Sequence, residues 1–178
     1  MKDSSKPLKN VEYKIAAELM RNSRRSDREI AKIVGVSQPT VSRIMERLEK
    51  NGVIREYTMI PDFGKLGYQL MGITFFKLGG TGEEAEKALR KRGDELDRQK
   101  DFASLMVVEG LGVTRDRAFV TLYKDYSEYL ETVRSVKQLP GINVESMVTF
   151  LVDLQDKNNY RILTMSKVAC HLSSLERA

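Results

Sequence analysis

Apolar residues in the first fifty positions recur at the three- and four-residue spacing of helices that bury one face. The first periodic stretch starts near Asn10, and its apolar side consists of Val11, Ile15, Ala16, Leu19 and Met20. A polar run at 21–25 ends it, and two shorter periodic stretches follow between Ser26 and Gly52. The pattern therefore predicts three successive helices.

Local signals place the boundary between the second and third helices. Ser26 and Glu29 have the spacing of a capping box, in which each side chain bonds the backbone amide of the other. Gly35 stands where a helix ends in a left-handed residue. Ser37 can cap the next helix, whose first turn tolerates Pro39 because amides there have no intrahelical partner. Two helices joined by a tight turn are expected.

The third helix divides into an apolar side and a polar side. Its core positions are Val41, Ile44, Met45 and Leu48, and this leaves outside Gln38, Thr40, Ser42, Arg43, Glu46 and Arg47. This is the construction of a helix-turn-helix that reads the major groove of DNA. The following segment, 53–60, is rich in strand formers and predicts a strand or short ribbon beside the helices.

The periodicity changes after residue 67. The residues at 61–67 have the composition of a linker, with one proline and two glycines. Beyond them we expect strands at 68–78, 102–109, 118–123 and 144–154, helices at 83–99 and 126–139, and a long connection at 110–117. This order is that of a ferredoxin-like βαββαβ sheet with both helices on one face. The other face of the sheet must also be covered, and we expect a second subunit to pack on it.

The fold class predicted is α+β, with a winged or ribbon-flanked helix-turn-helix, a ferredoxin-like sheet and an extra C-terminal helix. The domains expected are 1–60 for DNA binding, 61–67 as linker, 68–154 for oligomerisation and effector binding, and 155–178 as a helical tail. In the tail, apolar residues at helical spacing suit packing on this or another subunit: Ile162, Met165, Ala169 and Leu172.

Charge favours a polyanionic partner for the N-terminal part. The net charge is +5, and residues 1–62 hold 13 Lys and Arg against 9 Asp and Glu. Neutralising phosphates with such groups releases counterions and drives binding to nucleic acid.

The composition argues against several classes of function. Cys170 and His171 are the only residues of their kinds, so neither an intrachain disulfide nor a histidine triad is expected. We expect no enzyme, cofactor or metal. No apolar run is long enough to span a bilayer and the N-terminus lacks an apolar signal region, so a cytoplasmic protein without a membrane partner is expected.

The residues expected to contact double-stranded DNA fall into three sets. Gln38, Thr40, Ser42, Arg43 and Arg47 face the groove, where Arg43 or Arg47 could pair with guanine and Gln38 with adenine. Helix starts and arginines commonly bind phosphate, and the residues so placed include Arg25, Ser26, Arg28 and Ser37. Arg55 in the ribbon is a further candidate. The alternative is a solvated helix face in a module that binds protein.

The segment GVSQPTVSRIMERLEKNGVIREYTMIPD resembles the DNA-binding half of the Lrp/AsnC transcription regulators. The downstream order resembles that family's amino-acid-sensing domain, and 139–144 looks like its Leu-Pro-Gly-Val turn. The resemblance implies a homodimer, assembly of dimers into larger rings, and a small amino acid effector. Its effector connection, of the Gly-x-x-Asp kind, maps to Gly110, Gly112, Thr114 and Asp116, with about three extra residues before Asp116.

The function expected is therefore a sequence-specific DNA-binding transcription regulator, dimeric or higher, modulated by a small amino acid. One alternative is an architectural DNA-binding protein that needs no effector. Another, of a different class, is a metabolite-sensing domain that controls an enzyme by protein contact.

Overall fold

The computed structural model describes residues 8–79, 87, 103–112, 114–138, 143–158, 160 and 163–174. The chain forms two compact units. We call the first the reader unit; it comprises Met1–Ile60 and Leu163–Ala178. The second, the sheet unit, is Pro61–Ile162.

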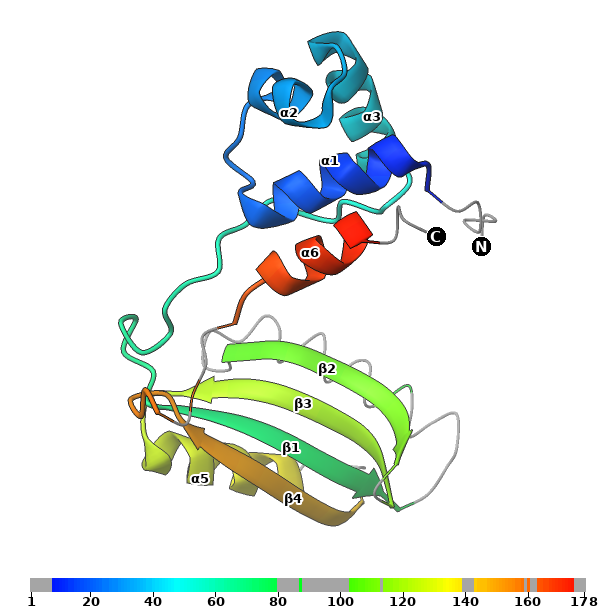
Figure 1. Cartoon of the computed structure of the whole chain (residues 1–178). Coiled ribbons are helices and arrows are strands. Elements are labelled where there is room, and N and C mark those ends of the chain that lie inside the picture. Colours follow the sequence, from blue (N-terminus) through cyan, green and yellow to red (C-terminus); the bar gives the residue numbers. More distant parts are fainter. Residues whose placement is uncertain are drawn as a thin grey trace. The chain divides into compact units, whose positions relative to one another are not determined.

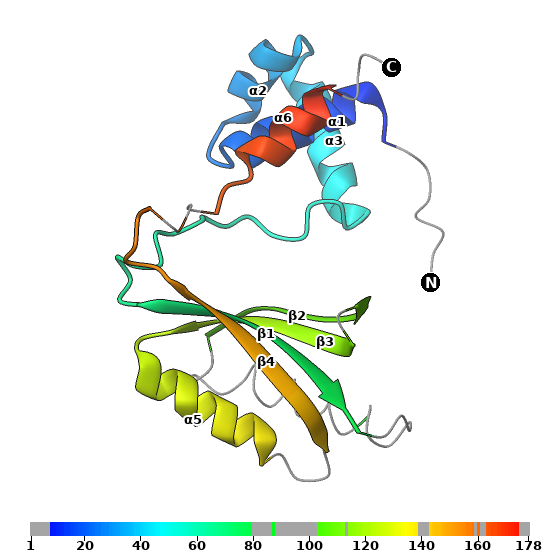
Figure 2. The ribbon, with the colours of Figure 1, turned by 60° about the horizontal axis from the view of Figure 1, so that its bottom comes forward.

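The reader unit contains α1 (Asn10–Arg21), α2 (Asp27–Val34), α3 (Gln38–Lys50) and α6 (Ser166–Ser174). Side chains from the first three helices meet in one core, formed by Ile15, Leu19, Ile30, Ala31, Val41, Ile44 and Leu48. The helical periods of the sequence are thus confirmed. The C-terminal helix α6 lies along α1, as Figures 1 and 2 both show.

The expected strand at 53–60 is wrong. These residues leave α3 through a turn, where the amides of Val53 and Ile54 donate to the carbonyl of Leu48, and then run without strand pairing. Tyr57 donates to Glu49 Oε1 at 2.7 Å, which ties the segment to α3. High strand propensity does not make a strand unless a neighbour satisfies the backbone groups.

The sheet unit contains β1 (Leu70–Leu78), β2 (Ala103–Gly112), β3 (Arg115–Tyr123), α5 (Tyr126–Lys137) and β4 (Val144–Asp153). All neighbouring strands are antiparallel and their order is β2-β3-β1-β4. Figure 2 shows α5 along one face of this sheet. The ferredoxin-like order is confirmed, while the helix expected at 83–99 lies outside the described residues except for Lys87.

The connection between β2 and β3 is much shorter than the sequence suggested. The strands continue to Gly112 and from Arg115, and these two residues still pair across the turn. A register shift between Glu109 and Gly112 accommodates residues that the sequence pattern predicts to lie in a loop. Glycines lowered the apparent strand propensity here, although glycine is common where a strand bulges.

The two faces of the sheet differ in cover. On the α5 face, Phe76, Leu78 and Phe119 are buried with Val136 of α5. On the opposite face, one row across the four strands is Val108, Ala118, Phe75 and Val148, and the next is Met106, Val120, Ile73 and Phe150. Phe150 is 66% exposed and Val148 is 56% exposed. We call these two rows the open face.

Gly72 gives a test of packing on the α5 face. A Cβ at this position would lie 2.8 Å from Tyr123 Cε2 and 3.3 Å from Thr149 Cγ2. Gly72→Ala should therefore lower the free energy of unfolding by about 1–3 kcal/mol, as overpacked sites do. Urea unfolding followed by circular dichroism measures this change.

Gly110→Ala is the matched control, because nothing lies within 4 Å of a Cβ there. Equal unfolding midpoints for the two variants would contradict the packing described.

Candidate nucleic-acid interface

The start of α2 is a complete capping box. The backbone amide of Ser26 donates to Glu29 Oε2 at 2.8 Å, and the amide of Glu29 donates to Ser26 Oγ at 3.3 Å. The hydrogen bonds from Ser26 lower the pKa of Glu29 below its ordinary value of 4.5. Gly35 ends the helix with φ of +79°. The predicted boundaries of the helix-turn-helix are thus confirmed at both ends of α2.

The start of α3 is capped by Ser37. The amide of Thr40 donates to Ser37 Oγ at 3.4 Å, and the two side-chain oxygens lie 2.8 Å apart. Pro39 occupies the first turn as expected. The hydroxyls of Ser37 and Thr40 therefore belong to the N-terminal cap of α3, where Gln38 is exposed and Thr40 is partly buried.

One side of α3 holds the helix in the unit and the other is open. Val41, Ile44 and Leu48 are buried. On the outer side a shallow hollow is lined by Gln38, Pro39, Ser42, Arg43 and Glu46. Three of the residues predicted to face the groove thus line one surface.

Ser42 lies on this surface and also stabilises the fold. Its hydroxyl donates to the carboxylate of Asp27 and lies 3.2 Å from the carbonyl of Gln38. Because Asp27 opens α2, this contact ties the two helices of the motif together. By contrast, within the part of the chain that the structure describes, the side chains of Gln38 and Arg43 make no hydrogen bond or ion pair.

Arg47 is held by a carboxylate from α1. It forms an ion pair with Glu12, whose side chain is buried while that of Arg47 is 44% exposed. Glu12 also accepts from the backbone amide of Lys9 at 2.5 Å. The pair fixes the direction of Arg47 and neutralises part of the charge that it would offer to DNA.

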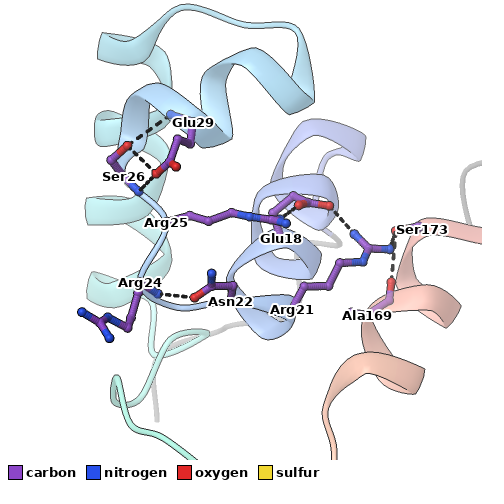
Figure 3. A network of polar contacts seen from close by, with 9 residues as sticks. All are labelled: Glu18, Arg21, Asn22, Arg24, Arg25, Ser26, Glu29, Ala169 and Ser173. Atoms are coloured by element: carbon purple, nitrogen blue, oxygen red, sulfur yellow. Dashed lines mark hydrogen bonds and ion pairs between the residues drawn. The ribbon is translucent and has the colours of Figure 1, made fainter.

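Arg25 is held in the same way by Glu18. Figure 3 shows Glu18 between Arg21 and Arg25, and it is ion-paired with both. Arg24 lies beside them, and its guanidinium points away from this network. Arg28 in the first turn of α2 and Arg55 after α3 are exposed.

Glu12 and Glu18, which the sequence pattern did not single out, each hold one of the candidate arginines. Both lie in α1 within the helical period that also contains Ile15 and Leu19, so they occupy its buried side. A carboxylate on an apolar face requires a cationic partner, and unpaired burial would be costly. That rule could have indicated arginine partners, although it could not have said which.

The predicted effector residues lie at the β2–β3 turn. Gly110 and Gly112 line a small pocket together with Phe75, Val108, Ala118, Arg115 and Arg117. Thr114, with φ of +58°, lines an adjacent hollow with Lys77 and Glu145. The side chain of Asp116 lies outside the described part of the chain. The turn thus places three of the four residues at two neighbouring hollows.

Metal-ligand clusters and membrane-spanning helices are both absent from the described residues. In those ranges no three His, Cys, Asp or Glu side chains are grouped to hold a metal ion. Nor is any helix there long and apolar enough to cross a membrane.

Known proteins share this arrangement. Residues 8–55 match a family described as winged helix-turn-helix DNA-binding. An uncharacterised helix-turn-helix transcriptional regulator of Pyrococcus horikoshii is 38% identical over 150 residues, covering 80% of this chain and 96% of that protein. The leucine-responsive regulatory protein of Rhizobium meliloti is 29% identical, covering 71% and 85%. The chain belongs to the Lrp/AsnC family of transcription regulators.

Solved structures of transcriptional regulators have the same fold. Escherichia coli AsnC covers 89% of this chain and 99% of its own, with a TM-score of 0.68 and 19% identity. A transcriptional regulator of Neisseria meningitidis, solved as its L-Met complex, covers 91% and 99%, with a TM-score of 0.69 and 16% identity. The Lrp/AsnC fold therefore extends through both units of the chain.

Removing the cap hydroxyl should weaken the reader unit. Ser26→Ala is expected to lower the free energy of unfolding by about 1 kcal/mol, because the amide of Glu29 loses its acceptor. Ser26→Thr keeps a hydroxyl at the same place and should recover most of the loss. Chemical denaturation of the three proteins measures this, and equal losses for both variants would contradict the cap.

The capping box should also make stability depend on pH. Because the pKa of Glu29 is lowered in the folded chain, its ionised form stabilises the fold above the unfolded pKa, near 4.5. This contribution is lost as the pH falls through the folded-state pKa. Thermal unfolding of the wild type and Glu29→Gln should differ most above pH 5 and converge in acid. A difference that stays constant with pH would contradict this assignment.

Proposed function

We propose that the chain is a sequence-specific DNA-binding regulator in which α3 reads the major groove and acts by binding, without catalysis. The observation that carries this proposal is the outer surface of α3. Gln38 and Arg43 are exposed there without protein partners among the described residues, while the opposite side of the helix is fixed in a core. Side chains that are free on a rigid helix suit hydrogen bonding to base edges. With DNA as the ligand, the expected compartment is the cytoplasm.

The ion pairs assign different roles to the arginines. Arg43 is our principal base reader, because an arginine can bond guanine in a bidentate manner. Arg47 and Arg25 carry carboxylate partners, so we propose that they contact the phosphate backbone with the part of the guanidinium left free. Arg28 and Arg55 are proposed as further phosphate contacts because they are exposed.

A homodimer is proposed because the open face is apolar and exposed. Its two rows include Phe75, Val148 and Phe150, and contiguous exposed apolar surface of this kind marks an interaction site. Two sheet units meeting through this face would carry two reader units, which can then bind half-sites about 34 Å apart. Larger rings of dimers are a further expectation of the family resemblance.

A small amino acid is proposed as effector at the β2–β3 turn. The pocket there combines apolar side chains with Arg115 and Arg117, and an arginine can pair with the carboxylate of an amino acid. Arg117 is already ion-paired with Glu109, so part of its charge is engaged. The L-Met complex of the Neisseria relative gives this ligand class its second support.

Arg43→Ala tests the reading surface. We expect discrimination between the selected operator and a single-base variant of it to fall by about 1–3 kcal/mol, because one bidentate contact is lost. Arg134→Ala is the matched control, since it removes the same charge from an exposed position of α5. Affinities are measured by gel shift on DNA selected from a random pool.

Arg28→Ala should act differently if Arg28 binds phosphate. It should weaken binding to all sequences alike and reduce the magnitude of the negative slope of log affinity against log salt by about 1.

The outcome that would contradict the assignment of α3 as reader is unchanged discrimination between the two DNA sequences in Arg43→Ala.

Thermal shift with a panel of amino acids separates regulation by an effector from the architectural alternative. A ligand at 100 times its Kd should stabilise the fold by about 2.7 kcal/mol. No shift with any amino acid, combined with retained DNA binding, would favour the architectural protein. The protein-contact alternative requires that wild-type chain selects no DNA sequence.

A further inference from the structure

The C-terminal helix α6 is part of the reader unit although it follows the sheet unit in the chain. Ala169 of α6 is fully buried, and Leu172 is partly buried. Arg21 Nη2 of α1 donates to Ser173 Oγ at 3.0 Å, and Ser173 in turn donates to the carbonyl of Ala169 at 3.0 Å (Figure 3). These contacts seat α6 along α1.

The burial of α1 shows what α6 adds. Ile15 and Leu19 belong to the core shared with α2 and α3. Ala17 is also fully buried, yet its position in a helix lies on the side away from Ile15. The helix α1 is therefore covered on two sides, and among the described helices α6 packs on it in addition to α2 and α3. Two fully buried alanines, Ala17 and Ala169, allow the helices to approach closely.

This packing joins the two units twice. The first connection runs from Ile54, which packs against the reader core, to Phe63, which is buried in the sheet unit. The second runs from Leu154, buried in the sheet unit, to α6. At full extension these connections span at most about 30 Å and about 40 Å. A unit held by one short connection can rotate about it, whereas a second connection removes much of that freedom.

We propose that α6 is a strap that fixes the spacing of operator half-sites. It limits the orientations that a reader unit can take relative to its sheet unit. This inference rests on the proposed function, because it needs a dimer that presents two readers. Moving a half-site by one base pair rotates it by about a tenth of a turn around the duplex, so a strapped dimer should lose the second contact as the spacing approaches half a turn from the preferred one. Ala169 and Ser173 are positioning residues in this scheme.

Polar contacts also extend from the strap towards the α1–α2 turn. Arg21 contacts both Ser173 and Glu18, and Glu18 also holds Arg25. Figure 3 shows this series reaching the turn that precedes Ser26. The docked strap thus shares a network with a residue proposed to bind phosphate. Release of α6 would remove one of the contacts that hold Arg21 beside Glu18.

Two full-length variants test the strap by different routes. Ala169→Glu places a carboxylate at a fully buried position and should release α6 from α1. Cys170→Glu is the matched control, because it adds the same group at the adjacent exposed position. A flexible six-residue insertion between Leu163 and Thr164, both exposed, lengthens the strap while leaving the contacts of α6 intact.

The measurement is affinity for a series of DNA duplexes in which the spacing of the two half-sites is varied one base pair at a time. For the wild type and Cys170→Glu we expect one preferred spacing, with affinity falling about a hundredfold or more at half a turn away as the second contact is lost. For Ala169→Glu and for the insertion we expect that fall to shrink to about tenfold or less.

Other outcomes overturn the proposal in recognisable ways. If Ala169→Glu weakens binding equally at every spacing and the insertion changes nothing, α6 only stabilises the reader unit. If both variants keep the wild-type spacing profile, the strap does not set it. If the wild type selects no DNA at all, the proposed function fails before the strap is tested. Helical content measured by circular dichroism shows whether Ala169→Glu remains folded, and the insertion decides the question if it does not.

Discussion

Burial of α1 on two sides is the constraint on which the reader unit depends. One side forms the core with α2 and α3, through Ile15 and Leu19, and the other receives α6. A helix of twelve residues is only marginally stable by itself, so its structure comes from this packing. Because α3 is anchored to the same core, its outer surface has a fixed direction. Readout of base edges needs that rigidity, since a misplaced donor loses its hydrogen bond.

Buried carboxylates give α1 a second role. Glu12 and Glu18 occupy its buried side and hold Arg47 and Arg25, which come from α3 and from the turn before α2. Each pair removes positive charge from the surface and fixes the direction of a long side chain. The affinity of a DNA-binding surface for any sequence grows with its free cations. At the proposed DNA surface, engaging some arginines would therefore lower nonspecific attraction, and it leaves Arg43 as the exposed arginine of α3 without a partner among the described residues.

The sheet unit also has one covered face and one exposed face. Strand alternation sends one set of side chains to the α5 face and the other to the open face. The register makes the open face continuous across all four strands, from Val108 to Val148. The strands continue past Gly110, so the proposed effector pocket forms at a tight turn at the end of the sheet. A ligand there would lie beside Phe75 and Val108 of the open face. If subunits assemble through the open face, a ligand in this pocket would act on their assembly through these neighbouring side chains.

The sequence alone determined the features that depend on neighbours three or four residues away. The Ser26 and Glu29 cap, the stop at Gly35, the Ser37 cap and the buried side of α3 are local, and so their residue types predicted them. The strand order was also accessible, because the alternation of elements leaves few arrangements.

Only the tertiary structure decided features that depend on residues distant in the chain. It paired Arg47 with Glu12 across 35 positions and seated Ser173 against Arg21 across 152. It left residues 53–60 without a strand partner. It also continued β2 and β3 through residues whose sequence predicts a loop. Propensity describes what a segment tolerates, whereas pairing and charge compensation depend on which partner the fold brings within reach.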